Sequence, residues 1–351
     1  MKPRSQEDLE HLLAEAEKVR GNSLWKDAMR RFRKNLAARL SLWFLILLSL
    51  VCVLTPLLPL APPARVRLAE QFQPPKLQLV RGGWSAKDYH DLGWVSQKMV
   101  DLRASIFGDK EIGPIMGTDS KGRCLLSRIL WGGRISLLVG LVATLVSLLV
   151  GVSYGALSGY LGGWVDNLMM RIVDVLYSIP FIFLVIFLIT VLRENQDLLE
   201  KRYGLDRMTL FFGVIGLVYW LTMARVVRGQ VLSLKHKEFV EAARVMGAST
   251  GRILRQHLVP NVLSIVIVYL TLTIPRVMLF EAFLSFLGLG VQPPDVSWGI
   301  LAANGIDAIN PIHVYWWFVL FPGLALGFTL VALNFLGDGL RDALDPKLKD
   351  R

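Results

Sequence analysis

The sequence predicts an all-α polytopic membrane protein with six transmembrane helices and both termini in the cytoplasm. Hydrophobic residues make up 53% of the chain, and its mean hydropathy is +0.47. Uncharged apolar runs recur, each of roughly 20 residues, the length that a helix needs to cross the hydrocarbon core of a bilayer. These runs must be helical, because an open strand edge in lipid would leave backbone groups unpaired.

Six apolar runs are expected to span the membrane. The first is a retained helix rather than a cleaved signal peptide, since a long polar segment precedes it and no small-residue cleavage site follows it. The six expected spans are 40–60, 135–161, 172–192, 208–224, 259–280 and 314–336.

The distribution of Lys and Arg sets the orientation, because short loops rich in these residues stay in the cytoplasm. Seven lie in the twenty residues before the first span, seven in 225–258 and four after Gly337, whereas 283–313 has none. The segments 193–208 and 157–171 run weakly against this pattern. An even number of spans then places both termini in the cytoplasm.

The expected spans divide the chain into five parts. The N-terminal part is predicted to form amphipathic helices, and "SLWKDAMRRFRKN" has the aromatic stripe of a helix lying among lipid headgroups, with a solvated basic linker as the alternative. The parts are the cytoplasmic segment 1–39, the first transmembrane helix 40–60, the external loop 61–133, the five-helix core 134–336 with its cytoplasmic coupling loop 225–260, and the cytoplasmic tail 337–351.

Glycine recurs at every fourth residue in the second span and the turn after it, at positions 151, 155, 159 and 163. This spacing leaves a smooth groove on one helix face, so Gly151 and Gly155 are expected to pack closely against another helix. For Gly159 and Gly163, formation of the turn is an equal alternative. Pro180, Pro275 and Pro322 lie inside spans, where each removes a backbone hydrogen bond and permits a bend.

No motif for catalysis or cofactor binding occurs in the context that its chemistry requires. The best phosphate-loop match, "GTDSKGRC", has Arg123 and Cys124 where Lys and Ser/Thr are needed, and it lies on the external side. The five histidines show no metal-ligand spacing, and the two G-x-S-x-G matches, at 151–155 and 247–251, follow no predicted strand, which an acyl-enzyme elbow requires. We therefore expect no catalytic, cofactor-binding or metal-binding residues, although an intramembrane enzyme built from dispersed residues stays open. The net charge of +11 gathers at membrane flanks, which argues against nucleic acid as a partner and favours anionic lipid.

Ionisable residues inside spans would indicate a proton-coupled carrier. Asp174, Arg225, Arg276 and Glu281 are the candidates, and each lies near an expected span end. Arg171 precedes Asp174 by three residues and is expected to pair with it. Since no acid falls at a bilayer midplane, the energy source is expected to lie on another chain.

The charged stretch "EFVEAARVMGASTGRILRQHLVPN" lies between two apolar spans on the cytoplasmic side. It predicts two short helices around a bend. Gly247 is suited to the left-handed conformation that ends the first helix, Ser249 or Thr250 caps the second, and the second ends before Pro260. Small residues beside charges make a face that another protein can approach closely, and an ordinary solvated loop is the alternative.

This stretch resembles the signature of permease subunits of binding-protein-dependent ABC importers: E-A-A, three residues, G, nine residues, then an apolar stretch ending in proline. The matching residues are Glu241, Ala242, Ala243, Gly247 and Pro260. "HLVPN" is similar to the ending usual in the oligopeptide/dipeptide branch, with Val259 in place of leucine. Blocks at 116–137, 162–180, 281–299 and 337–347 resemble the same branch in the same order, and the likeness runs from about Ser23 to Lys347.

The resemblance implies the type I ABC importer permease core in the bacterial cytoplasmic (inner) membrane, and the second-permease, or C-type, subunit of a peptide importer. The implied partners are a second homologous permease, two cytoplasmic ABC ATPase subunits that bind the ATP, and an external peptide-binding protein. Glu241 would make a polar contact with the ATPase, Ala242 and Ala243 would allow close approach, Gly247 would form the bend and Pro260 would end the motif.

Two features depart from the family pattern, and two other functions remain as alternatives. Cys124 replaces the usual Asp of "GRD", and the 61–113 insert is longer than in short dipeptide permeases. The alternatives are an ABC permease for a non-peptide solute such as nickel and, less favoured, a proton-coupled carrier. The residues that bind substrate are not identified by the sequence.

Overall fold

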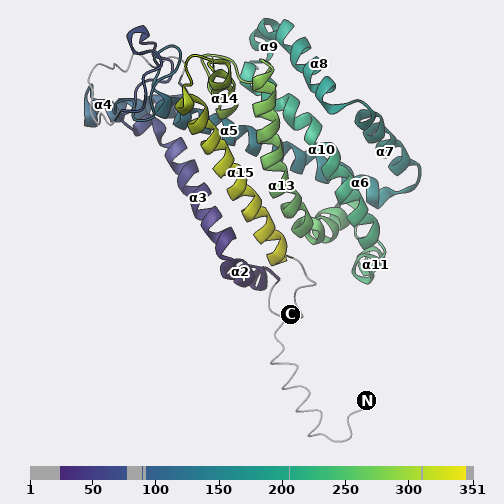
Figure 1. The fold of residues 1–351 in the computed structure, drawn as a ribbon. Coiled ribbons are helices and arrows are strands. Elements are labelled where there is room, and N and C mark those ends of the chain that lie inside the picture. Colours follow the sequence, from purple (N-terminus) through teal and green to yellow (C-terminus); the bar gives the residue numbers. More distant parts are fainter. Residues whose placement is uncertain (1–23, 77–88, 90–91, 205, 310, 345–351) are drawn as a thin grey trace, which may run out of the picture.

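The computed structural model describes residues 24–76, 89, 92–204, 206–309 and 311–344. The amphipathic helix expected over residues 5–20 lies outside this part, as does most of the aromatic segment around Trp84. Figure 1 shows a bundle of long helices with α2 (Leu24–Lys34) and α11 (Glu238–Val245) at one end. The opposite end carries three short helices, which are α4 (Trp94–Phe107), α9 (Gln196–Tyr203) and α14 (Trp298–Asp307).

Five continuous helices are long and apolar enough to cross a membrane. Three of them are single α-helices: α3 (Leu36–Val53), α10 (Arg207–Leu234) and α15 (Trp316–Leu344). The fourth consists of α5 (Leu125–Val146), the π-helix Ser147–Gly151 and α6 (Val152–Leu161). The fifth consists of α12 (Thr250–Arg252), the π-helix Ile253–Leu258 and α13 (Val259–Phe286). The predicted all-α architecture is confirmed, with five continuous spans, or six where the bent pair of helices is counted as one.

The span expected at 172–192 is divided between α7 (Gly163–Ser178) and α8 (Phe181–Glu194), which meet at an angle of 87°. Ile179 has extended backbone angles, φ −81 and ψ 125, and Pro180 caps α8. The Pro180 ring disfavours helical angles at the preceding residue, so the proline ends α7 instead of only bending it. Pro275 and Pro322, in contrast, lie inside the continuous helices α13 and α15.

Several helices extend beyond the apolar runs that predicted them. α5 begins at Leu125, α10 continues to Leu234 and α15 continues to Leu344. Part of the expected coupling loop and part of the expected tail are therefore helical. The continuation of α15 packs on the start of α3, where an added Cβ at Gly339 would lie 2.2 Å from the Ala38 Cβ.

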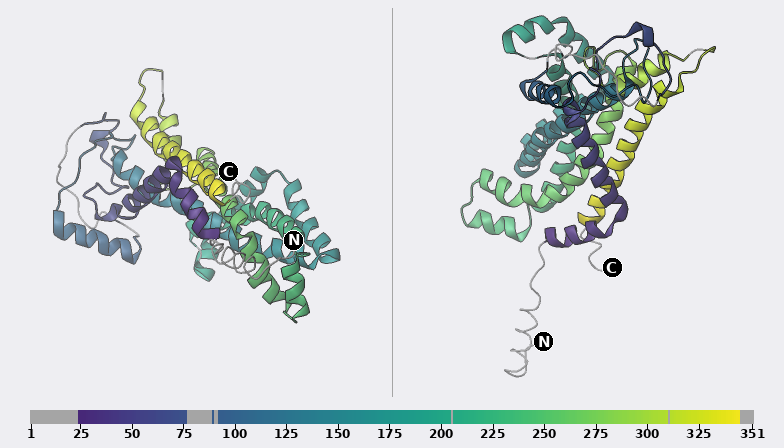
Figure 2. Two further views of the ribbon diagram at one scale, coloured as in Figure 1. Left: turned by 90° about the horizontal axis from the view of Figure 1, so that it is seen from below. Right: turned by 90° about the vertical axis from the view of Figure 1, so that its left-hand side faces the viewer.

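The buried apolar side chains form separate clusters along the bundle. One includes Trp298 and Phe318, which are fully buried between α5, α14 and α15. A second packs α8 against α10 through Val185 and Ile215. A third lies at the end that carries α11 and joins α6, α10, α11 and α13. Seen from below in Figure 2, the external helix α4 and the bent pair α7 and α8 lie at opposite edges.

Buried polar groups fix the external segment before α5. The Asp119 carboxylate accepts hydrogen bonds from the backbone of Lys121 and Arg123 and forms ion pairs with Arg123 (2.7 Å) and Arg128 (2.5 Å). Glu111 pairs with Arg67 across the same region. The phosphate-loop-like sequence "GTDSKGRC" is thus a turn organised around Asp119.

Both cysteines are buried and free of disulfides. Cys124 caps the start of α5, and burial raises the pKa of its thiol. A neutral, buried thiol is a poor nucleophile, so Cys124 is not suited to redox chemistry.

Candidate functional site

The helix α11 carries the motif that sequence analysis singled out. Its first turn contains Glu238 and Glu241, and acidic residues at a helix N-terminus stabilise the helix dipole. Val240 is fully buried, whereas Glu241 and Ala242 are exposed and Ala243 is half-buried. Val240 therefore packs α11 against the rest of the protein, and the opposite side of the helix is accessible to solvent.

Gly247 ends α11 with a φ of +78°. The Gly247 amide donates to the Arg244 carbonyl and the Ala248 amide to the Ala243 carbonyl, each at 3.0 Å. This pair of bonds is the Schellman arrangement, in which the residue after the helix adopts a left-handed conformation that glycine tolerates best. Ala243 therefore supplies a capping carbonyl in addition to its small side chain.

The end of α11 exposes two apolar side chains next to this turn. Val245 and Met246 are 87% and 86% exposed, and each has more of its surface accessible than any other large apolar side chain in the described residues. Single exposed apolar residues are common, but two adjacent ones on a charged helix are typical of a contact surface.

The segment after the bend differs from the expected second short helix. Ser249 caps α12 through its backbone, and the helix then runs without interruption through the π-helix Ile253–Leu258 into α13. Pro260 lies in the first turn of α13 and follows this wider turn directly. The π-helix gives the proline ring space that an α-helix would deny it, so the chain is not broken there.

Apolar packing connects α11 directly to the membrane helices. Val240 belongs to the buried cluster that contains Val231 of α10 and Ile253 and Leu258 of the π-helix. The cluster also contains Ala156 of α6. A displacement of α11 therefore has to move the inner ends of α6, α10 and α13, because packed interiors transmit strain.

A charged network ties the same helix ends together. Arg228 of α10 donates to both Asp166 oxygens in α7, at 2.6 and 2.5 Å, and Ser158 of α6 donates to Asp166 at 2.5 Å. Lys235 donates to the Gly159 carbonyl at 3.1 Å. Sequence reasoning missed Asp166 and Arg228, since 62 residues separate them and nothing in the local pattern pairs them.

We expect Asp166→Asn to weaken this inner network. The substitution keeps a side-chain oxygen but removes the charge that Arg228 binds in bidentate geometry, a loss of about 2 kcal/mol for charge-assisted hydrogen bonds. The midpoint of thermal aggregation in detergent should fall. Asp174→Asn is the matched control, because the Asp174 side chain is 61% exposed and its ion pair is monodentate. Equal midpoints for the two variants would contradict a structural role for Asp166.

The glycines expected to pack a helix lie where α6 crosses α10. An added Cβ at Gly151 would lie 2.6 Å from the Met223 Cβ, and one at Gly155 would lie 2.3 Å from the Ala224 carbonyl oxygen. Gly159 is as close to α10, with the Arg228 carbonyl oxygen 2.9 Å from its added Cβ. Gly163 instead has a φ of +56° and no atom near its added Cβ, so it belongs to the turn.

The predicted local pairing of Arg171 with Asp174 is wrong. Asp174 pairs with Arg225 of α10 at 2.8 Å. The Arg225 guanidinium lies over the Tyr177 ring, 3.9 Å from its centroid. Glu281 is likewise a structural acid, because it is buried and accepts hydrogen bonds from Ser285 and Ser297, each at 2.7 Å.

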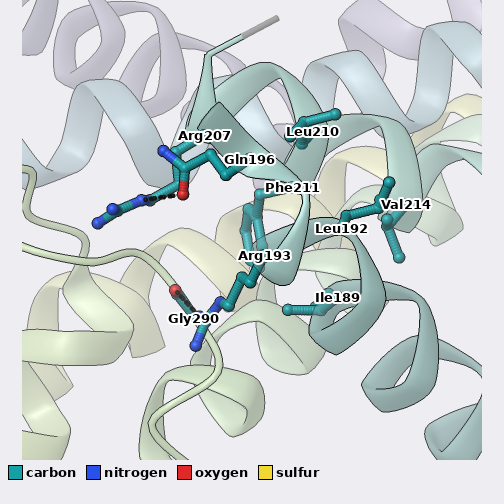
Figure 3. A pocket seen from close by; sticks show the side chains of 9 residues that line it. All are labelled: Ile189, Leu192, Arg193, Gln196, Arg207, Leu210, Phe211, Val214 and Gly290. Carbon is teal, nitrogen blue, oxygen red and sulfur yellow. Dashed lines mark hydrogen bonds between the residues drawn. The ribbon is translucent and has the colours of Figure 1, made fainter. Parts of the chain in front are cut away.

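A small apolar pocket lies at the outer end of the bundle, between α8, α10 and the loop after α13 (Figure 3). Arg193 points toward this loop and donates to the carbonyls of Leu289 (2.9 Å) and Gly290 (3.3 Å). Arg207 donates to Gln196 at 3.1 Å. Both arginines therefore help to hold the outer helix ends together.

The described residues contain no group of three His, Cys, Asp or Glu side chains placed to hold a metal ion. Glu241 and Ala242 are exposed on α11, whereas Ala243 is half-buried, Gly247 follows the helix and Pro260 lies in α13.

Two family models match this chain, one over its N-terminal segment and the other over its membrane core. Residues 126–350 match the family described as "Binding-protein-dependent transport system inner membrane component", and residues 23–75 match "N-terminal TM domain of oligopeptide transport permease C". The oligopeptide transport system permease protein OppC of Escherichia coli K12 is 46% identical over 98% of each chain. The dipeptide transport system permease protein DppC of Bacillus subtilis is 39% identical over 95% of this chain and 90% of its own. A solved chain of the MetNI methionine ABC transporter aligns with a TM-score of 0.48 and 21% identity, covering 63% of this chain and 98% of that one.

Proposed function

Because the chain belongs to the family of binding-protein-dependent transport system inner membrane components, we propose that it is a permease subunit of an ATP-driven peptide importer. It is a multi-pass inner membrane protein with the helical core of this family. The relatives that match along nearly its whole length are oligopeptide and dipeptide permeases, which supports peptides as the transported solute.

In this proposal the exposed face of α11 docks on a cytoplasmic ATPase subunit. The observation that carries the proposal is the exposure of Glu241, Ala242 and Val245 on α11, whose only buried residue is Val240, and of Met246 directly after the helix. The two apolar side chains would enter a groove of the ATPase, and Glu241 would form a polar contact at its rim. The chain itself would be a non-enzymatic subunit, and a pair of such ATPases would bind and hydrolyse the ATP.

The mechanism proposed is a rigid-body movement of the inner helix ends. ATP would draw the two ATPases together and carry α11 with them. Val240 and its cluster would pass this displacement to α6, α10 and α13. Because coupling is reciprocal, the solute-releasing state of the membrane helices and the closed state of the ATPases would favour each other. A second permease would complete the path, and an external binding protein would deliver the solute.

The docking face can be tested by co-purification from the bacterium that encodes the chain. Val245→Asp combined with Met246→Asp should reduce the amount of ATPase recovered with the permease roughly tenfold or more, because two desolvated apolar contacts are replaced by charges. Ile312→Asp is the control, since Ile312 is 84% exposed and lies in the loop before α15, on the opposite side of the membrane.

The outcomes separate the parts of the proposal. Full recovery of the ATPase with the double variant would exclude α11 as the docking element. Failure of the unaltered chain to bring down any ATPase, together with solute uptake by the chain alone in liposomes under a pH gradient, would replace the importer with a proton-coupled carrier. Uptake of nickel rather than labelled peptide by the reconstituted complex would overturn the peptide substrate.

A further inference from the structure

A row of polar side chains follows the membrane-embedded faces of three helices. It consists of Arg171, Asp174 and Tyr177 of α7, Tyr219, Thr222 and Arg225 of α10, and Arg276 of α13, and we call it the polar stripe. α10 packs against both α7 and α13 and lies between them in Figure 1. The stripe therefore forms one connected surface.

Arg276 lies inside the expected span 259–280, and Thr222 and Arg225 lie at the cytoplasmic end of the expected span 208–224. Arg276 is ten residues before the end of α13 and Arg225 nine before the end of α10, which is roughly 15 Å of helix in each case. The side chains of Asp174 and Arg225 are nevertheless 61% and 42% exposed, and Arg276 and Thr222 are also exposed. Ionisable side chains inside spans face a protein interior or a water-filled cavity, because hydrocarbon does not solvate charge. The face that carries the stripe is therefore not turned to lipid.

Contacts within the stripe hold its side chains in place. The hydroxyls of Tyr177 and Thr222 share a hydrogen bond at 2.5 Å. The Arg225 guanidinium lies over the ring of the same tyrosine. Tyr219 donates to the backbone carbonyl of Arg276 at 3.3 Å and so joins α10 to α13. These bonds fix the stripe along both helices.

Arg276 differs from the other arginine near the centre of the stripe. Arg225 is neutralised by Asp174, whereas the guanidinium of Arg276 has no hydrogen-bond or ion-pair partner among the described residues. Arg171 is also without one in this part of the chain. Three arginines against one aspartate give the stripe a formal charge of +2. An exposed, unpaired guanidinium inside a membrane span is matched to a carboxylate, which it can bind through two parallel hydrogen bonds.

We propose that the polar stripe is this chain's wall of the solute path and that Arg276 binds the carboxylate of the passing solute. The assignment rests on the proposed function, in which the solute is a peptide and its C-terminal carboxylate is the anion. Arg276 lies nearer the external ends of the helices, so it meets the carboxylate first, and Arg225 with Asp174 and then Arg171 lie further along the stripe toward the cytoplasm. At Arg225 the solute carboxylate would compete with Asp174 for the guanidinium, so the solute would not be bound too tightly to move on.

The first test measures whether water reaches the stripe in the assembled importer. Both native cysteines are buried and free, so variants with one added cysteine can be labelled over a low background. Thr222→Cys should react with a charged, membrane-impermeant methanethiosulfonate. Leu217→Cys is the control, since Leu217 is 55% exposed on α10 and lies five residues away, on another side of the helix. Reaction of Thr222→Cys without reaction of Leu217→Cys supports a water-lined path, and an unreactive Thr222→Cys overturns it by showing that lipid or the second permease covers the stripe.

The second test measures carboxylate recognition by uptake into vesicles that contain the complete importer. Arg276→Gln should lower uptake of a labelled tripeptide with a free C-terminus roughly tenfold or more, the loss expected for a charge-assisted pair, and should change uptake of the same tripeptide amide far less. Arg276→Lys should restore part of the preference. Arg341→Gln, which removes an exposed arginine from the last turn of α15, is the matched control.

Equal losses for the free peptide and its amide would overturn the role of Arg276 in binding a carboxylate. If the unaltered importer takes up no peptide of either kind, the peptide substrate fails, and the labelling of Thr222→Cys still decides whether the stripe lines a path.

Discussion

Replacing Gly247 with valine should leave the protein folded in the membrane and abolish most of its transport. Gly247 has a φ of +78° and its added Cβ would meet no atom within 4 Å, so the substitution is strained by backbone conformation and not by crowding. A β-branched side chain disfavours the left-handed region by more than the 1–2 kcal/mol or so typical of other residues. The Schellman bonds to Ala243 and Arg244 would open and α11 would change its direction relative to α12.

The loss should appear as uncoupling. In reconstituted vesicles, solute-stimulated ATP hydrolysis and uptake should both fall about tenfold or more, which corresponds to a displaced equilibrium of roughly 1.4 kcal/mol or more. Gly251→Val is the matched control, because Gly251 lies four residues later in the helical segment, is exposed and has no positive φ. Normal uptake and stimulation in Gly247→Val, with the Gly251→Val control unchanged, would remove the bend from the coupling mechanism.

The sequence was sufficient for features that depend on neighbouring residues. Gly247 ends α11 as the pattern predicts, because the residue after this helix has a left-handed conformation that glycine adopts without steric cost. The long apolar runs also became helices, since lipid leaves the backbone no other partner. The boundaries were less well predicted, because α10 and α15 continue past the apolar runs into polar turns that helix propensity and packing still favour.

Features that depend on residues distant in sequence could not be predicted. Arg171 is three residues from Asp174, and this spacing suggested a local pair, but α7 lies against α10 and presents Arg225 to the carboxylate instead. The bend of 87° between α7 and α8 also depends on tertiary packing, because a proline inside a span is compatible with either a kink or a complete break. The same packing brings Asp166 to Arg228 across 62 residues.

The glycine pattern in α6 is the case in which sequence and packing agree most closely, and it carries the second large effect. Gly155→Val should destabilise the protein by about 3 kcal/mol or more, near the upper end of the range for overpacked interiors. An added Cβ would lie 2.3 Å from the Ala224 carbonyl oxygen and 3.0 Å from the Arg228 amide nitrogen, and both atoms belong to the backbone of α10. A flexible side chain could rotate away from such a contact, but a helix backbone can relieve it only by moving as a whole.

Separation of α6 from α10 would disturb more than the local contact. Ala156 and Val227 belong to the cluster that buries Val240, so the support of α11 would loosen as well, and both the midpoint of thermal aggregation and ATP-driven uptake should fall together. Gly213→Val is the matched control, because it places the same side chain on α10 with no atom within 4 Å of the added Cβ. If both variants aggregate at the same temperature, the close approach of α6 to α10 does not limit stability. If only Gly155→Val is destabilised, the small residues of α6 are required for the rigid unit through which movement of α11 reaches the membrane helices.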